Sequence, residues 1–421
     1  MHIAHLLRKY NPAEWGGTET VIRQLFEGLR HDGVASTVYC PTIAPNNVRD
    51  PLLDAGCTVR RFNACVPVWG ISAEQRRQMI AVGGNLLSFD LLRLLWAARD
   101  LSVIHSHTLG RIGGIGLTMA RRRKIPFVLT IHGGVYDLPE ALRRSFDAPL
   151  PRGWEWGKPF GLLLRARRVL VEADAILTCN AREAELIRER HPDRRVIVQP
   201  HGVRAEAYAT DHRAAALAAF PILGDRQVVL SLGRIDAVKN QRWIVDQLPE
   251  LRRRHPRVLL VLAGACTDEA YGADLQRRIR ELALEPHVLV TGKLPPADPR
   301  LIGLLQQARV AMLQSVSETF GLVILEAWAA GTPAVSSRTS GASALIEHGR
   351  NGWLFDLADP GSFHAAIDTA LTNAPAREQA IAAGRQRVTA EFDTQVLASR
   401  VRRLYEQLVE EKHAVRHTAG R

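Results

Sequence analysis

Short apolar runs alternate with amphipathic segments along most of the chain. In the first half the runs have the length and composition of β-strands, and they begin at His2, Ser36, Thr58, Ser102, Pro126, Ala175 and Arg195. Segments between them, for example residues 18–30 and 161–173, have helical spacing. This alternation predicts βαβ units and a parallel sheet, with functional side chains at the carboxyl ends of the strands.

The alternation is interrupted once and then resumes. Residues 204–225 contain no strand-like run and are interpreted as a connection. A second series of apolar runs begins at Gln227, Val258, His287, Arg309 and Thr332. We therefore predict an α/β protein with two Rossmann-like domains facing a cleft, residues 1–203 and 204–390. For residues 391–421 we expect a C-terminal helix over 394–413, followed by a frayed tail. This helix is expected to pack back on the N-terminal domain.

Composition narrows the class of protein. A chain of 421 residues with 46% hydrophobic and 23% charged residues is typical of a globular protein of two or three domains. The five cysteines have no CxxC spacing, which argues against a zinc or disulfide framework. No secretory leader and no membrane-spanning run is evident, so we expect a cytoplasmic protein.

Charge is distributed unevenly along the sequence. The net charge is +12, and residues 1–205 carry 29 Lys and Arg against 19 Asp and Glu. This excess is either an ordinary solvated surface or a surface that faces an anionic membrane, lipid phosphate or nucleic acid. No nucleic-acid-binding signature accompanies it. We therefore expect no nucleic-acid partner and retain an anionic membrane surface as a candidate.

Two cations follow the first strand of the second series. In the stretch SLGRIDAVKN, Arg234 comes just after the strand and Lys239 lies where a helix is expected to begin. Cations at this edge of a parallel sheet can bind a pyrophosphate. Taken alone, the two residues fit ordinary surface charge better than a binding site.

A pair of glutamates lies in the stretch SETFGLVILEAWAAGTPAV. Gly321 permits a tight turn, and a helix starting near Phe320 would leave the amides of Phe320, Gly321 and Leu322 free to bind phosphate. Glu318 then precedes the helix and Glu326 lies about one and a half turns into it. The two carboxylates could border one cleft at different depths, or they could be two solvated charges.

Three further motifs occur in the first half. EWGGTET places Gly16 and Gly17 between a strand and a helix, HSHTLG places His105 and His107 at a strand end, and TIHGG places His132 at the next. Glycines there allow a close backbone approach to a ligand. The histidines also allow a metallohydrolase interpretation, although the carboxylate ligands expected at the following strand ends are missing.

Together these motifs, with SGASALIEHGRNGWLF, resemble the retaining glycosyltransferases of family 4, which have the GT-B fold, from about His2 to about Ala370. The resemblance implies an N-terminal acceptor-binding domain and a C-terminal nucleotide-sugar-binding domain. The donor is then a nucleotide-diphosphate sugar, used as a substrate, and no cofactor or metal is expected. The family's geometry favours a front-face reaction in which the leaving phosphate helps to deprotonate the acceptor.

The resemblance also assigns roles to individual residues. Arg234 and Lys239 would neutralise the donor diphosphate, and Gly17 would lie beneath it. Glu318 would contact the transferred sugar, as a positioning and electrostatic residue, with His132 beside that sugar. Glu326 would hold the ribose hydroxyls. Donor contacts would be completed by the amides of Phe320, Gly321 and Leu322 and by the backbone near Lys293.

The chain departs from the family at one place. Where the family has a glycine pair followed by x-Pro-Glu, this sequence has Ser340 for the first glycine, Ser343 for the proline and Ala344 for the glutamate. That glutamate supports the wall of the donor site in the family. The departure puts the local shape of the pocket in doubt, while activity is still expected.

The acceptor is the least constrained part of the hypothesis. The basic N-terminal half holds an insertion at 135–160 in which Trp154 and Trp156 could stack on sugars, lie at a membrane interface or be core residues. We expect a peripheral enzyme on the inner face of the membrane, with a glycan or lipid-linked acceptor such as a surface-polysaccharide intermediate. The alternatives are a GT-B epimerase or phosphorylase, or a non-catalytic nucleotide-sugar-binding protein.

Overall fold

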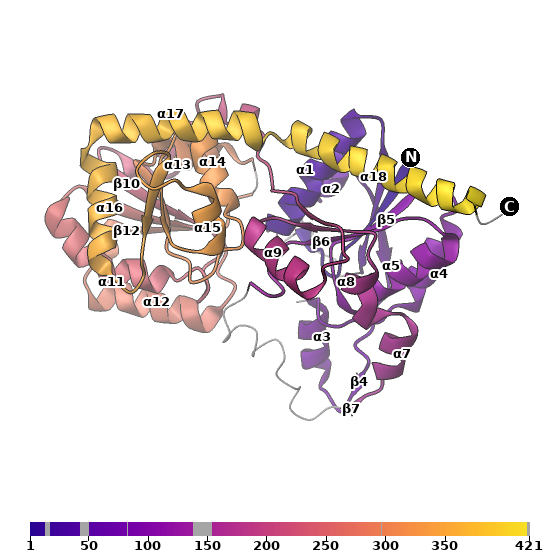
Figure 1. The fold of residues 1–421 in the computed structure, drawn as a ribbon. Helices are drawn as coiled ribbons and strands as arrows, with labels where there is room; N and C mark the ends of the chain where they lie inside the picture. Colours follow the sequence, from indigo (N-terminus) through magenta and orange to yellow (C-terminus); the bar gives the residue numbers. More distant parts are fainter. Residues whose placement is uncertain (13–16, 43–49, 82, 138–153, 296, 419–421) are drawn as a thin grey trace. The chain divides into compact units, whose positions relative to one another are not determined.

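A computed structural model describes residues 1–12, 17–42, 50–81, 83–137, 154–295 and 297–418 (Figure 1). The chain forms two compact units. Unit 1 comprises Met1–Pro200 together with Thr394–Arg421, and unit 2 comprises His201–Asp393. The observed boundaries, after residues 200 and 393, each lie three residues from the boundaries expected after residues 203 and 390.

Unit 1 is built on a seven-stranded sheet in the order β3-β2-β1-β5-β6-β8-β9. Every neighbouring pair is parallel. All seven predicted strands are present: β1 (His2–Leu6), β2 (Ala35–Pro41), β3 (Thr58–Phe62), β5 (Val103–Ser106), β6 (Phe127–Ile131), β8 (Ala175–Thr178) and β9 (Val196–Val198). A separate antiparallel ribbon, which was not predicted, pairs β4 (Val68–Trp69) with β7 (Trp154–Glu155).

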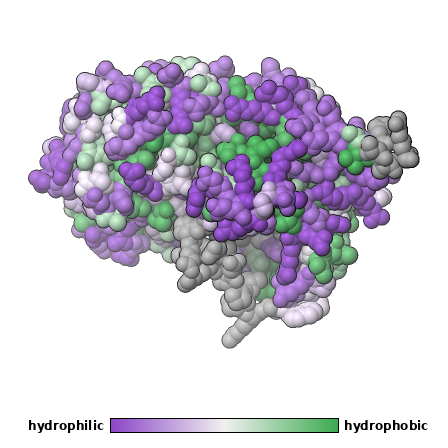
Figure 2. Space-filling model, in the orientation of Figure 1, coloured by the Kyte–Doolittle hydropathy of each residue, from purple (hydrophilic) through white to green (hydrophobic). Residues whose placement is uncertain are grey.

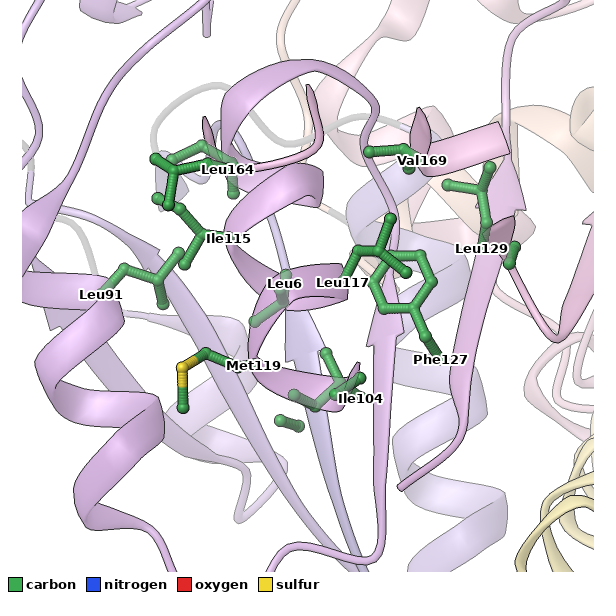
Figure 3. Close-up of a cluster of buried hydrophobic side chains, with 14 of the residues drawn as sticks. Leu6, Leu91, Ile104, Ile115, Leu117, Met119, Phe127, Leu129, Leu164 and Val169 are labelled. Carbon is green, nitrogen blue, oxygen red and sulfur yellow. The ribbon is translucent and has the colours of Figure 1, made fainter. Parts of the chain in front are cut away.

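Unit 1 also contains helices, several of which pack against this sheet. They are α1 (Gly17–His31), α2 (Pro51–Asp54), α3 (Ala73–Ala81), α4 (Phe89–Ala97), α5 (Gly110–Arg123), α7 (Lys158–Leu163), α8 (Val169–Glu172), α9 (Ala181–Arg190) and α18 (Thr394–Thr418). Figure 3 shows α5 contributing Ile115, Leu117 and Met119 to a cluster of buried apolar side chains on the sheet. A Cβ at Gly116 would lie 2.4 Å from Leu6 Cδ1, so this glycine allows α5 to pack closely on the sheet.

The helix predicted over residues 161–173 is wrong as a continuous element. The chain instead forms α7, a short 3₁₀ turn at Ala166–Arg168, and α8. Arg165 adopts the left-handed conformation with φ of 56°, which interrupts the helical hydrogen-bond ladder. Tertiary packing has here overridden the amphipathic pattern.

Unit 2 contains a six-stranded parallel sheet in the order β12-β11-β10-β13-β14-β15. Five strands match the predicted runs: β10 (Gln227–Leu232), β11 (Val258–Ala263), β12 (Val288–Gly292), β13 (Val310–Leu313) and β14 (Ala334–Ser337). The sixth, β15 (Gly352–Phe355), was missed.

The helices of unit 2 follow the strands in the expected alternation. They are α10 (Arg213–Ala219), α11 (Gln241–Arg254), α12 (Glu269–Glu281), α13 (Pro299–Gln307), α14 (Leu322–Ala330), α15 (Ser340–Leu345), α16 (Pro360–Thr372) and α17 (Ala374–Glu391). Residues 204–225 are not a bare connection, because α10 lies within them and packs on α13. No helix in the described part of the chain has the length and apolarity needed to cross a membrane.

Candidate active site

In unit 2, the predicted donor residues converge at the carboxyl ends of two neighbouring strands. Arg234 and Lys239 lie in the loop after β10, and Glu318 lies in the loop after β13, which pairs with β10. Lys239 Nζ forms an ion pair with Glu318 Oε2, and both side chains are mostly buried. The structure thus brings together two residues that are 79 positions apart in sequence.

Asp236, which was not predicted as a site residue, organises the cations. Its carboxylate accepts the Lys239 amide at 2.9 Å and pairs with Arg234 Nη2 at 3.1 Å. The exposed Arg234 side chain is thereby directed by a nearly buried acid. Asp236 could have been inferred from its position three residues before Lys239, where a side chain commonly accepts a backbone N–H.

Hydrogen bonds tie the two loops together. Gln314 Nε2 donates to Lys239 O at 2.7 Å, and the Val316 amide donates to Val238 O at 2.9 Å. Because both bonds join the β10 loop to the end of β13, the Lys239–Glu318 pair rests on a preorganised backbone.

Helix α14 begins at Leu322, two residues later than expected. Gly321 precedes it with φ of 95°, a conformation that favours glycine. Within the described residues no side chain caps the first turn of α14, where the positive end of the helix dipole lies. Phe320 is buried and packs edge-on against His201 at 5.0 Å, so only its backbone suits donor binding.

Glu326 lies on α14 in a different environment from Glu318. Burial raises the pKa of Glu326 to about 7. Tyr208 lies in the turn Ala205–Tyr208, which packs on α14, and its pKa is raised by burial and further by the charge of Glu326. The two glutamates are therefore not equivalent, since one is ion-paired and the other is desolvated.

The departure from the family pattern falls at the start of α15. Gly341 N donates to Glu318 O at 2.9 Å and Ser340 Oγ donates to the same oxygen at 3.4 Å. A Cβ on Gly341 would lie 2.4 Å from Phe320 N, so this glycine is needed for contact with the loop before α14. Ser343 and Ala344 are exposed.

Lys293 occupies a different place on the sheet. It is exposed and follows β12, an edge strand separated from β10 by β11. Gly292 before it has φ of 69°, which turns the chain as the strand ends. Lys293 thus shares the carboxyl edge of the sheet with Arg234 but lies two strands away.

The remaining predicted residues, Gly17 and His132, belong to unit 1. Gly17 is the first residue of α1, and the preceding Gly16 lies outside the described residues. His132 directly follows β6, at the carboxyl edge of the sheet as predicted.

His132 ends a chain of three imidazoles. His5 Nδ1 lies 3.1 Å from His107 Nε2, and His107 Nδ1 lies 2.8 Å from His132 Nε2. Burial lowers the pKa of His5 to about 3 and that of His132 to about 4, so both rings are neutral at pH 7.

These histidines bear on the metallohydrolase alternative. One nitrogen from each of His5, His105 and His107 lies within 4.8 Å of the others. However, both ring nitrogens of His105 are hydrogen-bonded. Its Nε2 lies 2.6 Å from Thr130 Oγ1, and its Nδ1 lies 2.5 Å from Tyr405 Oη. Hydrogen bonding to neighbours, rather than convergence of lone pairs on one point, favours a structural imidazole chain over a metal site.

A buried carboxylate that the sequence interpretation missed holds the loop after His132. Glu183, in the first turn of α9, accepts backbone N–H groups of Val135 at 2.9 Å, Tyr136 at 3.2 Å and Asp137 at 2.8 Å. Its own amide is capped by Asn180 Oδ1 at 2.8 Å. The Asn-x-x-Glu spacing resembles a capping box, but here the glutamate binds a neighbouring loop.

Comparison with known proteins places this geometry in a family context. Residues 16–222 match the family model described as a glycosyl transferase 4-like domain, and residues 213–387 match glycosyl transferases group 1. The chain is 30% identical to a glycogen synthase of Mycobacterium tuberculosis, over 80% of this chain and 79% of that protein. It is 29% identical to a D-inositol 3-phosphate glycosyltransferase of Stackebrandtia nassauensis, over 88% and 82% of the two chains.

Solved structures give the same fold. Anabaena HepE in complex with UDP and glucose superposes with a TM-score of 0.75 at 18% identity, covering 97% of this chain and all of the other. A sucrose-phosphate synthase from Thermosynechococcus elongatus superposes with a TM-score of 0.73 at 21% identity, covering 97% and 99%.

Proposed function

The chain belongs to the GT4-type glycosyltransferases of GT-B fold, and from this premise we propose which sugar transfer it performs. The donor is a nucleotide-diphosphate hexose, and the acceptor is a hydroxyl of a lipid-linked or surface-polysaccharide intermediate. Transfer proceeds with retention at the anomeric carbon and without a metal ion. The observation that carries the proposal is the Lys239–Glu318 ion pair beside the open first turn of α14.

The donor assignment draws on the chemistry of this edge of the sheet. Arg234, Lys239 and the first amides of α14 supply positive potential where a diphosphate leaving group gains charge. Such groups can perform the task of a bound metal ion, because they are already oriented before the reaction begins. A uridine nucleotide is the first candidate, since HepE structures contain UDP or UDP-glucose.

The state of Glu318 bears on the route by which retention would be achieved. Retention by double displacement requires a free carboxylate close beneath the anomeric carbon. The Glu318 carboxylate is instead bound to the Lys239 ammonium, which makes it a poorer nucleophile and suits it to hold sugar hydroxyls. The leaving phosphate then accepts the acceptor proton on the same face, so the new glycosidic bond forms where the old one breaks.

A thermal-shift panel with UDP, GDP and ADP sugars tests the donor. We expect one nucleotide series to raise the melting temperature of the wild type, and Lys239→Ala to abolish most of that shift. Transfer from the selected donor should persist in EDTA, and NMR of the product should show the anomeric configuration of the donor sugar. An inverted product, loss of activity in EDTA, or interconversion of free nucleotide sugars without transfer would contradict the proposal.

A further inference from the structure

The net positive charge of the protein belongs entirely to unit 1. Unit 1 contains 34 Lys and Arg against 22 Asp and Glu, whereas unit 2 contains 21 of each. The excess of basic residues is therefore larger in unit 1 than in residues 1–205, because the C-terminal segment adds further cations to unit 1. A charge confined to one unit gives that unit a potential that attracts anionic surfaces.

Exposed apolar side chains are concentrated in the same unit. In the described part of the chain fourteen large apolar side chains are exposed, and twelve of them belong to unit 1. Four lie on the β4–β7 ribbon and on α7, which begins three residues after β7 ends: Trp69 is 59% exposed, Trp154 64%, Leu162 77% and Leu163 73%. Figure 2 shows hydrophobic side chains at the corner where Figure 1 draws α7.

The ribbon is a built element. Arg111, buried on α5, donates to Asn85 O at 2.7 Å and to Gly157 O at 3.1 Å, and it pairs with Glu155 on β7. Trp154 and Trp156 lie in different environments, because Trp154 belongs to β7 whereas Trp156 lies in the turn that follows it. Trp156 is partly buried against the core, whereas Trp154 stacks on Trp69 with ring centroids 5.0 Å apart.

Basic residues border these apolar side chains. Lys158 begins α7 and is exposed, and Arg167 is exposed in the turn that follows α7. Tryptophan rings prefer the headgroup level of a bilayer, leucine side chains favour the acyl boundary, and lysine and arginine favour anionic headgroups. All three preferences are met on one short stretch of unit 1.

We propose that Trp69, Trp154, Leu162 and Leu163, bordered by Lys158 and Arg167, form a docking surface for an anionic lipid bilayer. A glycan-binding platform is less well matched, because the two tryptophans stack on each other and the leucines offer no hydrogen-bonding group to a sugar. The inference rests on the proposed function, because binding to the bilayer would bring the enzyme into contact with a lipid-linked acceptor.

Vesicle flotation of the full chain tests the docking surface. We expect wild-type protein to float with phosphatidylcholine–phosphatidylglycerol vesicles at low salt and to bind pure phosphatidylcholine at least tenfold more weakly. Leu162→Ser/Leu163→Ser and Trp69→Ala/Trp154→Ala should each lose about tenfold in vesicle binding. The matched controls Leu53→Ser and Ile222→Ser also replace exposed apolar residues, at 56% and 40% exposure, and should bind as the wild type does.

The outcomes separate the docking surface from the proposed function. Circular dichroism and melting temperature should be unchanged in the variants, and so should the thermal shift caused by the nucleotide sugar. Absence of wild-type binding to anionic vesicles at low salt, or equal binding by the variants, would overturn the docking surface, and so would equal binding to neutral vesicles. If the protein binds vesicles but no nucleotide sugar changes its melting temperature, the docking surface is retained and the proposed donor is rejected.

Discussion

At the residue scale, Glu318 in the loop before α14 and Glu326 on α14 have different electrostatic environments, although both are glutamates. Glu318 is held by Lys239, and Glu326 is desolvated. The spacing of seven intervening residues could not distinguish these states, because partners from β10 and from the Ala205–Tyr208 turn decide them. Glu183 shows the same limit, since it accepts backbone N–H groups of Val135 and Asp137 that only the fold brings near.

Glu318→Gln should reduce turnover strongly while leaving donor binding measurable. The amide keeps the size of the side chain but loses the charge that pairs with Lys239 and that, in the proposed function, binds the sugar hydroxyls. Loss of one preorganised electrostatic contact costs about 100- to 1,000-fold in kcat. The measurement is kcat at saturating donor, with Glu347→Gln, an exposed glutamate paired with Arg350, as the control. Turnover equal to the wild type would remove Glu318 from the site.

The desolvated Glu326 should make stability depend on pH. Its pKa of about 7 in the folded protein exceeds the ordinary value of 4.5, so the folded state favours the protonated form. The stabilisation associated with protonation is complete below pH 4.5 and is lost as the pH rises through about 7. Urea unfolding at pH 5 and pH 8 should show this decline in the wild type and a smaller decline in Glu326→Gln. Identical pH dependence of the two proteins would contradict the pKa assignment.

At the element scale, strands were predicted better than their connections. The apolar runs identified every strand of the unit 1 sheet, and the central strands β5, β6 and β8 are almost continuously buried, as expected of a parallel sheet covered on both faces. The helix expected at 161–173 failed at Arg165, where packing imposes a left-handed residue on an amphipathic segment. The β4–β7 ribbon joins residues 68–69 to 154–155, and no local pattern signals so distant a pairing.

The contact of α15 with the loop before α14 gives a prediction about Gly341. An alanine Cβ would collide with the backbone at Phe320 and Glu318, which fix the α14 amides. Gly341→Ala should therefore raise the KM for the donor about tenfold or more, with a smaller effect on overall folding. Initial rates over a range of donor concentrations measure this KM. Gly349→Ala is not a suitable control, because Gly349 has φ of 81°. Ser343→Ala, at an exposed position on α15, is the better control, and an unchanged KM in Gly341→Ala would refute the contact.

The loop after β6 gives a second prediction at this scale. In Glu183→Gln an amide NH₂ group would face backbone N–H groups that the carboxylate now accepts. Leaving such buried donors unsatisfied costs about 1–3 kcal/mol in the free energy of unfolding. Transfer activity should fall as well, because the loop begins beside His132. Glu185→Gln, an exposed position on the same helix, should change neither quantity, and an equal effect of both substitutions would contradict a specific clamp.

At the scale of the whole molecule, the chain returns to unit 1 after completing unit 2. Helix α18 packs on α1 and contributes Val401, Leu404, Tyr405 and Leu408 to a core cluster with Ile3 and Val103. The sequence predicted this helix but not its specific partners, because an amphipathic stripe does not identify the surface that it covers. Unit 1 therefore needs both ends of the chain for its core.

Leu408→Ala tests this dependence. Removing a buried leucine from a packed cluster costs about 2–5 kcal/mol in the free energy of unfolding. Because the cavity opens in unit 1, we expect the melting of unit 1 to shift while unit 2 keeps its affinity for the nucleotide sugar. Calorimetry with and without donor separates the two effects, and Val415→Ala, at an exposed position further along α18, is the matched control. The expectation is contradicted if Leu408→Ala loses as much donor affinity as Lys239→Ala while the melting of unit 1 is unchanged. That result would show that α18 acts on donor binding by unit 2 instead.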